Sequence, residues 1–366
     1  MAILSRSLGT DDVKCDSWGR IIEKTCSPAV RTNQAAPPRA TTEIFIRDEE
    51  ENKEDEGYIT FEESMHRDGS IYRGMARCAW RRDFRIGDRS ETRLEATMRS
   101  DPTPNCTFYR DDGTCWGHHP TKGMLQFFSF EVAKLPPNAA GSVELYGYVA
   151  TRDDLDPSLN YVVNISRDDP IVVKQGSLID MAGPKRGIEM DDCTVVEYDM
   201  RIKNSAQEND DLQLIDGALV LEFYSTLRRP FTLDIPGECG TVGVTLASVY
   251  WVVEATLELL VLEVQTNFNM SLTCYTSGVD QEIRLFDGAI AEPRGLKRYV
   301  VAVASRSFLD LKFKIGEPPS NPGQHWCSFK AKVHGHVTQK IETEFHCDPD
   351  FALISVRVTW STLPSD

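Results

Sequence analysis

The stretch that decides the fold of this chain reads Val196-Glu197-Tyr198-Asp199-Met200-Arg201-Ile202-Lys203. Apolar and charged residues alternate along it, so an extended backbone gives one apolar and one charged face, whereas a helix would mix the two sets. The same period of two recurs at Leu309–Ile315 and Ala352–Trp360. These stretches predict strands that each bury one face.

A further strand is predicted at Val253–Val261, where the alternation is less regular. Leu260 and Leu262 make both faces apolar there, and the Ala, Leu and Glu residues also favour helix. We interpret the stretch as a central strand.

Short strands separated by turn residues, with no helical pattern between them, continue from about Gly123 to the C-terminus. This pattern predicts an all-β domain over residues 122–366, an antiparallel β-sandwich or stacked sheets. A weak internal duplication, with chance similarity as an equal alternative, relates residues 195–217 to residues 252–288. Each copy is expected to place an Asp-Gly turn, Asp216-Gly217 or Asp287-Gly288, after an extended run.

Residues 1–121 are predicted to form a low-order N-terminal extension. The first part combines Pro37-Pro38 and few large apolar residues with an acidic run at residues 48–56. Such a composition buries too little surface to offset the entropy lost on ordering. We therefore expect most of the extension to be disordered.

An arginine-rich part of this extension, residues 70–99, has arginine at every fourth position from Arg73 to Arg93. On a helix this spacing gives a slowly drifting basic stripe, although Gly74 and Gly87 weaken such a helix. One interpretation is a contact surface for RNA or the ribosome at residues 73–93. The other, which we favour, is a solvated segment that folds back against the acidic run.

The composition of the whole chain limits its function. Its net charge of −16 argues against phosphate-backbone binding by the protein as a whole, because Lys and Arg supply most of that affinity. No secretory signal is visible, and the longest uncharged stretch, residues 240–253, is too short for a membrane helix. We expect a cytoplasmic protein, with the nucleus as the alternative, that contacts no membrane.

The 10 cysteines of the chain include no CxxC pair and are interpreted as buried or idle thiols.

A series of local motifs runs from Met124 to Lys314. They are Val143-Glu144-Leu145-Tyr146-Gly147, Arg152-Asp153-Asp154-Leu155-Asp156-Pro157, Asn160-Tyr161-Val162, Arg167-Asp168-Asp169-Pro170, Gly183-Pro184-Lys185-Arg186-Gly187, Tyr198–Lys203 and Asp211–Gly217. In these motifs the chain resembles an uncharacterised family of domains abundant in grasses (Poaceae), catalogued as a domain of unknown function.

Members of that family occur alone or fused behind ribosome-inactivating domains, plant toxins that remove an adenine from ribosomal RNA. The resemblance implies a role in defence or stress. It implies no catalytic residues, because the toxin domain of the fused members is a separate unit. The nearest imitation of the toxin signature, a Glu and an Arg three positions apart, is Glu95 and Arg99, which are four apart, and we regard this as coincidence.

Acidic loops supply the best candidate binding residues. Asp153, Asp154 and Asp156 follow one predicted strand, and Asp168 and Asp169 follow a later segment. Clustered carboxylates at one end of a sandwich can hold calcium. Ion pairs with Arg152 and Arg167, together with turns before the following prolines, explain the same residues and are favoured over calcium.

Two further candidate sites are weaker. Lys185 and Arg186, between Gly183 and Gly187, could present cations to a phosphate or an acidic partner, although a solvated turn is favoured. Zinc ligands are suggested by Cys106, Cys115, His118 and His119, but their spacing fits no common pattern.

Catalytic motifs such as a P-loop, GxSxG or HExxH are not found in the sequence. We therefore predict a non-catalytic binding or interaction module without a cofactor, with a protein as the favoured partner. The alternative, which rests on the family association alone, is an rRNA N-glycosidase that inhibits translation.

Overall fold

The computed structural model covers residues 1–366. The residues that it describes are 14–15, 21–23, 39–40, 59–62, 65–72, 83–96, 121–137, 139, 141–191, 193–222, 229–276, 279–316, 323–344 and 351–363. The chain divides into two compact units, Met1–Pro37 and Pro38–Asp366. In the first unit, strands β1 (Lys14–Cys15) and β2 (Ile21–Glu23) form an antiparallel pair.

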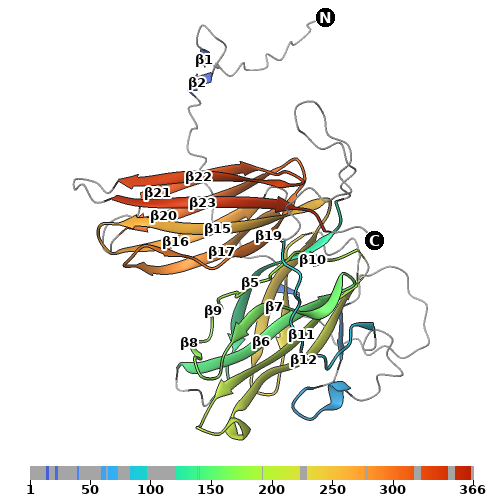
Figure 1. Ribbon diagram of the computed structural model, residues 1–366. Coiled ribbons are helices and arrows are strands. Elements are labelled where there is room, and N and C mark those ends of the chain that lie inside the picture. Colours follow the sequence, from blue (N-terminus) through green and yellow to red (C-terminus); the bar gives the residue numbers. More distant parts are fainter. Residues whose placement is uncertain are drawn as a thin grey trace, which may run out of the picture. The chain divides into compact units, whose positions relative to one another are not determined.

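The described residues of the second unit form four sheets, each named here after one central strand (Figure 1). The β5 sheet has the order β10-β5-β14-β13-β3, with β9 also paired to β5. Its strands are β3 (Arg39–Ala40), β5 (Met124–Lys134), β9 (Leu178–Ile179), β10 (Ile188–Glu189), β13 (Phe231–Pro236) and β14 (Thr241–Val249).

The β11 sheet has the order β4-β12-β11-β6-β7, with β8 also paired to β6. Its strands are β4 (Ile59–Glu62), β6 (Val143–Asp153), β7 (Asp156–Ile165), β8 (Ile171–Val173), β11 (Cys193–Lys203) and β12 (Leu212–Glu222). The short 3-10 helices η1 (Ser70–Tyr72) and η3 (Glu208–Asp210) lie in the connections.

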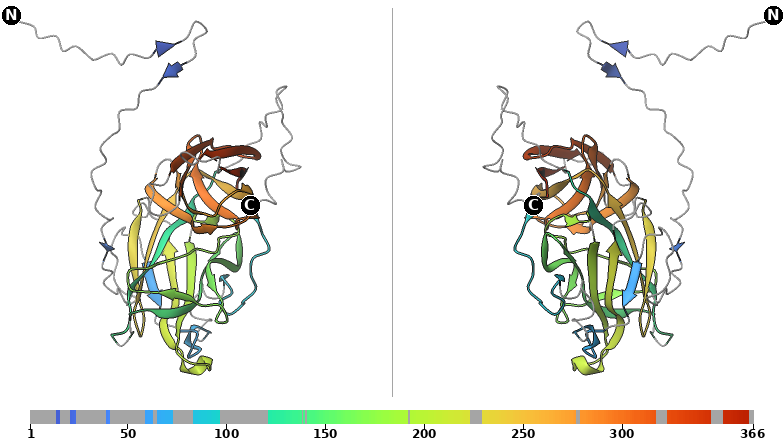
Figure 2. Two further views of the ribbon diagram at one scale, coloured as in Figure 1. Left: turned by 90° about the vertical axis from the view of Figure 1, so that its left-hand side faces the viewer. Right: turned by 90° about the vertical axis from the view of Figure 1, so that its right-hand side faces the viewer.

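The two remaining sheets hold the later strands, drawn orange to red in Figures 1 and 2. The β15 sheet has the order β18-β15-β23-β22, with β19 also paired to β15. Its strands are β15 (Val252–Val264), β18 (Arg294–Gly295), β19 (Tyr299–Ala304), β22 (Gly335–Glu344) and β23 (Phe351–Ser361). The β16 sheet has the order β17-β16-β20-β21 and contains β16 (Phe268–Thr276), β17 (Val279–Ile290), β20 (Phe308–Gly316) and β21 (Gly323–Lys330).

Two large apolar clusters join these sheets in pairs. One collects side chains such as Phe130 and Val244 of the β5 sheet with Val196 and Met200 of the β11 sheet. The other collects side chains of the β15 and β16 sheets, among them Leu257, Leu272, Leu311 and Trp360. Burial of this apolar surface is the main favourable contribution to the stability of each pair of sheets.

The all-β class and the antiparallel pairing predicted from the sequence are confirmed. The alternating stretches form β11, β20 and β23, and the irregular stretch forms β15, which is hydrogen-bonded on both sides. Among the named strands, β3 with β13 is the parallel exception. Both predicted Asp-Gly turns are wrong, because Asp216-Gly217 lies inside β12 and Asp287-Gly288 inside β17.

The charged face predicted for β11 is also buried, contrary to the simple alternation. Glu197 is 1% exposed and Asp199 is 7% exposed. Residues 65–72 and 83–96, the covering segment, lie on this side: Ile71, Phe84 and Ile86 form a third apolar cluster with residues of β11 and β12. A strand of the β11 sheet is therefore covered on both faces.

This covering segment falls within the predicted low-order extension and within the predicted arginine-rich helix. A continuous helix over residues 70–99 is not formed in the described part, since residues 88–95 have no helical hydrogen bonding and Glu91 makes a β-bridge to Leu159. The bridge replaces helical pairing because the segment lies beside β7. The acidic run at 48–56, Arg73, Arg77 and Arg81 lie outside the described residues.

Gly147 allows β6 and β11 to approach closely. It has φ +115°, and a Cβ atom built there would lie 2.1 Å from the carbonyl oxygen of Asp199. We predict that Gly147→Ala lowers the free energy of unfolding by about 3 kcal/mol or more. The new Cβ atom would force the backbone of Gly147 and Asp199 apart, and the positive φ is itself unfavourable for alanine.

The matched control is Gly141→Ala, since Gly141 also has positive φ (+86°) but nothing within 4 Å of a Cβ atom built at that position. We expect it to lose about 1 kcal/mol. Urea unfolding of both variants checks the difference; equal losses would show that crowding at Gly147 is unimportant.

Candidate functional site

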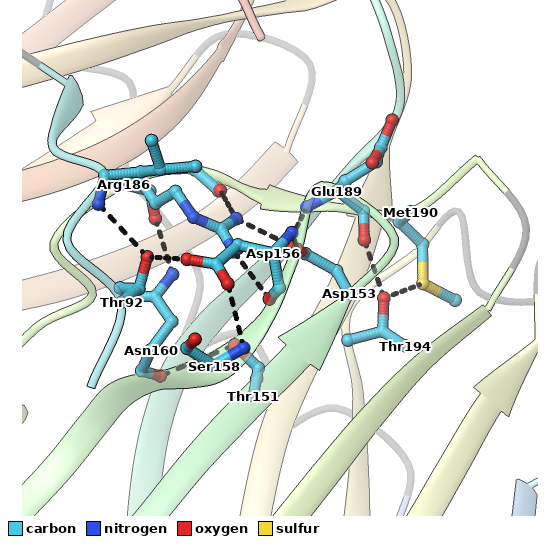
Figure 3. A network of polar contacts seen from close by, with 12 residues as sticks. Thr92, Thr151, Asp153, Asp156, Ser158, Asn160, Arg186, Glu189, Met190 and Thr194 are labelled. Carbon is cyan, nitrogen blue, oxygen red and sulfur yellow. Dashed lines mark hydrogen bonds and ion pairs between the residues drawn. The ribbon is translucent and has the colours of Figure 1, made fainter. Parts of the chain in front are cut away.

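The predicted acidic site residue Asp153 forms a buried ion pair with the predicted basic residue Arg186 (Figure 3). Asp153 ends β6, and Arg186 precedes β10. The guanidinium donates hydrogen bonds of 2.6 and 2.7 Å to the two carboxylate oxygens. The side chains are 1% and 0% exposed, so this charge pair is removed from water.

Arg186 is held by further acceptors around this pair. It donates to the backbone oxygens of Gly187 (2.9 Å) and Asp156 (3.2 Å). The backbone N–H of Gly187 donates to Glu254 of β15 at 2.7 Å, which links this loop to the β15 sheet. Burial alone would lower the pKa of Arg186, but the charge of Asp153 and its hydrogen bonds raise it, and the guanidinium stays charged.

Asp156 is also committed to partners within the fold. Its carboxylate accepts hydrogen bonds from the hydroxyl of Thr92 (2.6 Å) and the backbone N–H of Ser158 (3.0 Å). Burial by itself raises the pKa of Asp156, yet these hydrogen bonds and nearby Arg186 bring it below its ordinary value. The carboxylate is therefore ionised and anchors the covering segment through Thr92.

The remaining predicted site residues are exposed: Asp154, Asp168, Asp169 and Lys185. The ammonium of Lys185 lies 2.7 Å from Glu91. The two acidic loops lie at opposite ends of β7, whose 10 residues separate them by about 30 Å.

A calcium site that combines the two loops is therefore excluded by geometry. Within the described ranges no group of three or more His, Cys, Asp or Glu side chains is placed to hold a metal. The zinc candidates Cys106, Cys115, His118 and His119 lie outside those ranges.

A second buried network, which the sequence analysis missed, centres on His66. Its Nδ1 lies 2.6 Å from Asp216 Oδ1, and its Nε2 lies 2.9 Å from Glu197 Oε1. Arg152 donates to the other oxygen of Glu197 at 2.8 Å, and the hydroxyl of Tyr148 donates to Glu197 at 2.9 Å. Two carboxylates thus face two cationic side chains.

Ionisation in this network follows from its contacts. Burial alone would lower the pKa of His66, but hydrogen bonds to Asp216 and Glu197 raise it to about 9. Burial would raise the pKa of Glu197, but the hydrogen bond from His66 and the charge of Arg152 lower it to about 2. His66 is therefore an imidazolium at neutral pH, and Glu197 is a carboxylate.

One signal for this network is present in the sequence: carboxylates at Glu197 and Asp199 share one face of a predicted strand. The partner of Glu197 in the covering segment, His66, is 131 positions away. No local pattern connects residues at that separation.

An exposed aromatic group lies on a different part of the molecule, the outward side of the β16 sheet. Trp326 of β21 is 53% exposed, although β21 also supplies the buried Cys327 and Phe329. Its ring centroid lies 5.7 Å from that of Tyr275, with the planes tilted by 33°. The ammonium of Lys312 lies 5.3 Å from the same ring centroid.

Strand register defines the surroundings of Trp326. Lys312 is directly opposite Trp326, and Phe308 is directly opposite Lys330. Residues opposite one another share a side of a sheet, and Phe308 is 45% exposed. We call this surface the Trp326 face; it comprises Tyr275, Phe308, Lys312, Lys314, Trp326 and Lys330.

Comparison with models of known protein families identifies the family of this chain. Residues 124–349 match a family described as a domain of unknown function (DUF6598). The chain belongs to this family. The DUF6598 match extends from β5 through β22, so His66 of the covering segment and strand β23 lie outside it. The expected grass origin and the association of DUF6598 domains with ribosome-inactivating domains stay predictions.

Solved structures similar to the DUF6598 protein are distant. The C2A and C2B domains of Extended-Synaptotagmin 2 have 9% identity and a TM-score of 0.24, covering 67% of this chain and 93% of that one. Human GIVD cytosolic phospholipase A2 has 9% identity and a TM-score of 0.23, covering 68% of this chain and 34% of that one. Scores of this size support no argument about function. No curated protein matches the sequence.

The His66 network predicts a defined dependence of stability on pH. The pKa of His66 is raised from 6.5 to about 9, so its contribution is complete below about 6.5 and lost as pH rises through 9. The pKa of Glu197 is lowered from 4.5 to about 2, so its contribution is complete above about 4.5 and lost as pH falls towards 2.

We therefore expect the loss of stability in His66→Gln to be greatest between about pH 4.5 and 6.5, following the same two shifts. The measurement is urea unfolding of parent and variant across the pH range, with the exposed His336→Gln as control. A difference that does not change between pH 6 and 10 would disprove the charged state of His66.

Removal of one partner of the Asp153–Arg186 pair should be costly. Asp153→Asn leaves the buried guanidinium without its counter-charge, and we expect a loss of about 3 kcal/mol or more. The exposed Asp168→Asn, in the other acidic loop, should lose less than about 0.5 kcal/mol. Urea unfolding at pH 7 distinguishes the two; similar midpoints would show that the pair contributes little.

Proposed function

We propose that this DUF6598 protein is a non-catalytic recognition module made of two β-sandwiches, one from the β5 and β11 sheets and one from the β15 and β16 sheets. Its contact surface is the Trp326 face. The observation that carries the proposal is the half-exposed Trp326 in the middle of a strand, beside Tyr275 and Lys312.

Folding does not require a tryptophan at this position. Burial on the inward side of the β16 sheet is supplied by Leu309, Leu311, Phe313, Cys327 and Phe329. Polar residues would satisfy the outward side, yet it carries Trp326 and Phe308, both exposed. Aromatic side chains with exposed rings are enriched where proteins bind partners, since they provide large contact area at small entropic cost.

The state of the titratable groups supports a non-catalytic role. The buried carboxylates Asp153 and Glu197 each have a cationic partner in the fold. Burial raises the pKa of the Cys327 thiol to about 11 and raises that of Cys274 as well, so neither provides a thiolate nucleophile at neutral pH. Glu95, the acid of the nearest imitation of the toxin signature, pairs with Arg298 at 2.8 Å.

The setting of this role, defence or stress, is proposed from the family resemblance alone, and the cytoplasm or the nucleus stays the proposed location. Among the described residues no helix has the length and apolar character needed to cross a bilayer. The partner is proposed to be a macromolecule that contacts the Trp326 face.

The proposal is tested with a panel of ligand classes: oligonucleotides, glycans, acidic and basic peptides, and lipid vesicles. We expect at least one class to bind the parent protein at micromolar concentration and to bind Trp326→Ala at least ten-fold more weakly. The matched control is Trp251→Asn, which removes another exposed tryptophan (74%) at a residue whose φ of +49° asparagine tolerates. A panel in which nothing binds, or in which Trp326→Ala binds like the parent, contradicts the proposal.

A further inference from the structure

We propose that the Trp326 face binds single-stranded nucleic acid, with a base stacked on Trp326 and the phosphates paired with lysines of β20 and β21. This inference rests on the proposed function, which requires only that the face binds some partner. It adds the chemical class of that partner.

The aromatic part of the face provides a stacking position. The Trp326 ring is 53% exposed, and its orientation is fixed by neighbours: Tyr275 lies 5.7 Å away between ring centroids, and the Lys312 ammonium lies 5.3 Å from the ring centroid. A ring held in this way loses little freedom when a flat group stacks on it. Every base has such a flat surface, so stacking is tolerant of sequence.

The basic part of the face follows one strand. Lys312 and Lys314 alternate along β20 with Leu311, Phe313 and Ile315, which are buried, and so both lysines lie on the outward side. Residues two apart on a strand are about 7 Å apart, so the two ammonium groups form a short row beside Trp326.

Lysines outnumber carboxylates on the two strands that carry this row. On the outward side of β20 and β21, Lys312, Lys314 and Lys330 accompany one carboxylate, Asp310. A second carboxylate of the surface, Glu282 of β17, accepts a hydrogen bond from Tyr275 at 2.8 Å. The whole chain, in contrast, carries a net charge of −16. A local excess of positive charge in an acidic protein is complementary to a polyanion, and it steers one toward this surface.

Other ligand classes use only part of this arrangement. A neutral glycan would stack on Trp326 but leave the lysines without a role, and an acidic peptide would pair with the lysines but offer Trp326 no flat group. A membrane is better contacted by an exposed aromatic residue at a turn, as Trp251 is between β14 and β15. Trp326 instead lies within a strand, β21, at the edge of the β16 sheet. A single strand of nucleic acid combines flat bases with regularly spaced anions.

The test uses the full chain and a fluorescently labelled oligouridylate of about 20 nucleotides, longer than the 4–16 nucleotides that comparable single-strand sites cover. Anisotropy should show micromolar binding that weakens with salt. Trp326→Ala should bind about ten-fold or more weakly, because stacking contributes roughly 1–3 kcal/mol per base. Trp326→Tyr, which keeps a smaller ring, should recover part of the affinity, and Trp251→Asn should bind like the parent.

The lysines are tested through the salt dependence. Lys312→Gln with Lys314→Gln should reduce the slope of log K against log[salt] by about 1 to 2, since each phosphate contact on a single strand contributes about 0.7. Circular dichroism melting of each variant confirms that it is folded. An unchanged slope would exclude these lysines as phosphate contacts.

Parallel titrations with polygalacturonate, polyglutamate and phosphatidylserine vesicles test the nucleic-acid assignment separately from the proposed recognition function. If oligouridylate does not bind, or binds Trp326→Ala like the parent, the nucleic-acid assignment is overturned. If one of the other ligands binds in a Trp326-dependent manner instead, the proposed recognition function stands and only its ligand class is wrong. If Trp326→Ala changes no titration, both fall.

Discussion

The neutralisation of Glu197 by Arg152 and His66 is the constraint on which the covered β11 sheet depends. Glu197 lies on the outward side of β11 and is 1% exposed. A carboxylate without a partner at this depth would cost several kcal/mol or would take up a proton. Arg152 comes from the neighbouring strand β6, and His66 comes from the covering segment. The segment can bury the charged side of β11 because it brings the second cation with it.

The Asp153–Arg186 pair repeats this arrangement where the two pairs of sheets meet. Thr92 of the covering segment contacts Asp156, and Glu254 of β15 accepts the hydrogen bond from Gly187 beside Arg186. Elements distant in sequence therefore converge on one charged group. In this network the carboxylates of Asp153 and Asp156 are engaged in holding the fold together. The proposed recognition surface, the Trp326 face, lies where the architecture places few demands on side-chain type.

The sequence predicts the strands well because their signal is local. Alternation identifies β11, β20 and β23 from consecutive residues, and the pattern follows directly from the geometry of a strand with one buried side. It could not show that the other side of β11 is also buried, since that depends on Ile71 and Phe84, more than 100 positions earlier. The acidic motifs were expected in loops, and Asp154, Asp168 and Asp169 lie there, whereas Asp153 ends β6 and Asp156 begins β7. The pairing of Asp153 with Arg186 was not predicted, because only the folded sheets bring these two residues together. Trp326 itself has no distinguishing local pattern, and its exposure is apparent only from the register of β20 with β21.

The state of His66 is the most direct test of this account. Nitrogen-15 NMR of the histidine ring at pH 7.5 should show both ring N–H protons, slowly exchanging with water, because one donates to Asp216 and the other to Glu197. Such a signal identifies a buried imidazolium, and it should persist until the pH approaches 9. A neutral ring with a single N–H proton at pH 7.5 would contradict the account, since the carboxylates beneath the covering segment would then lack the charge that holds the segment in place.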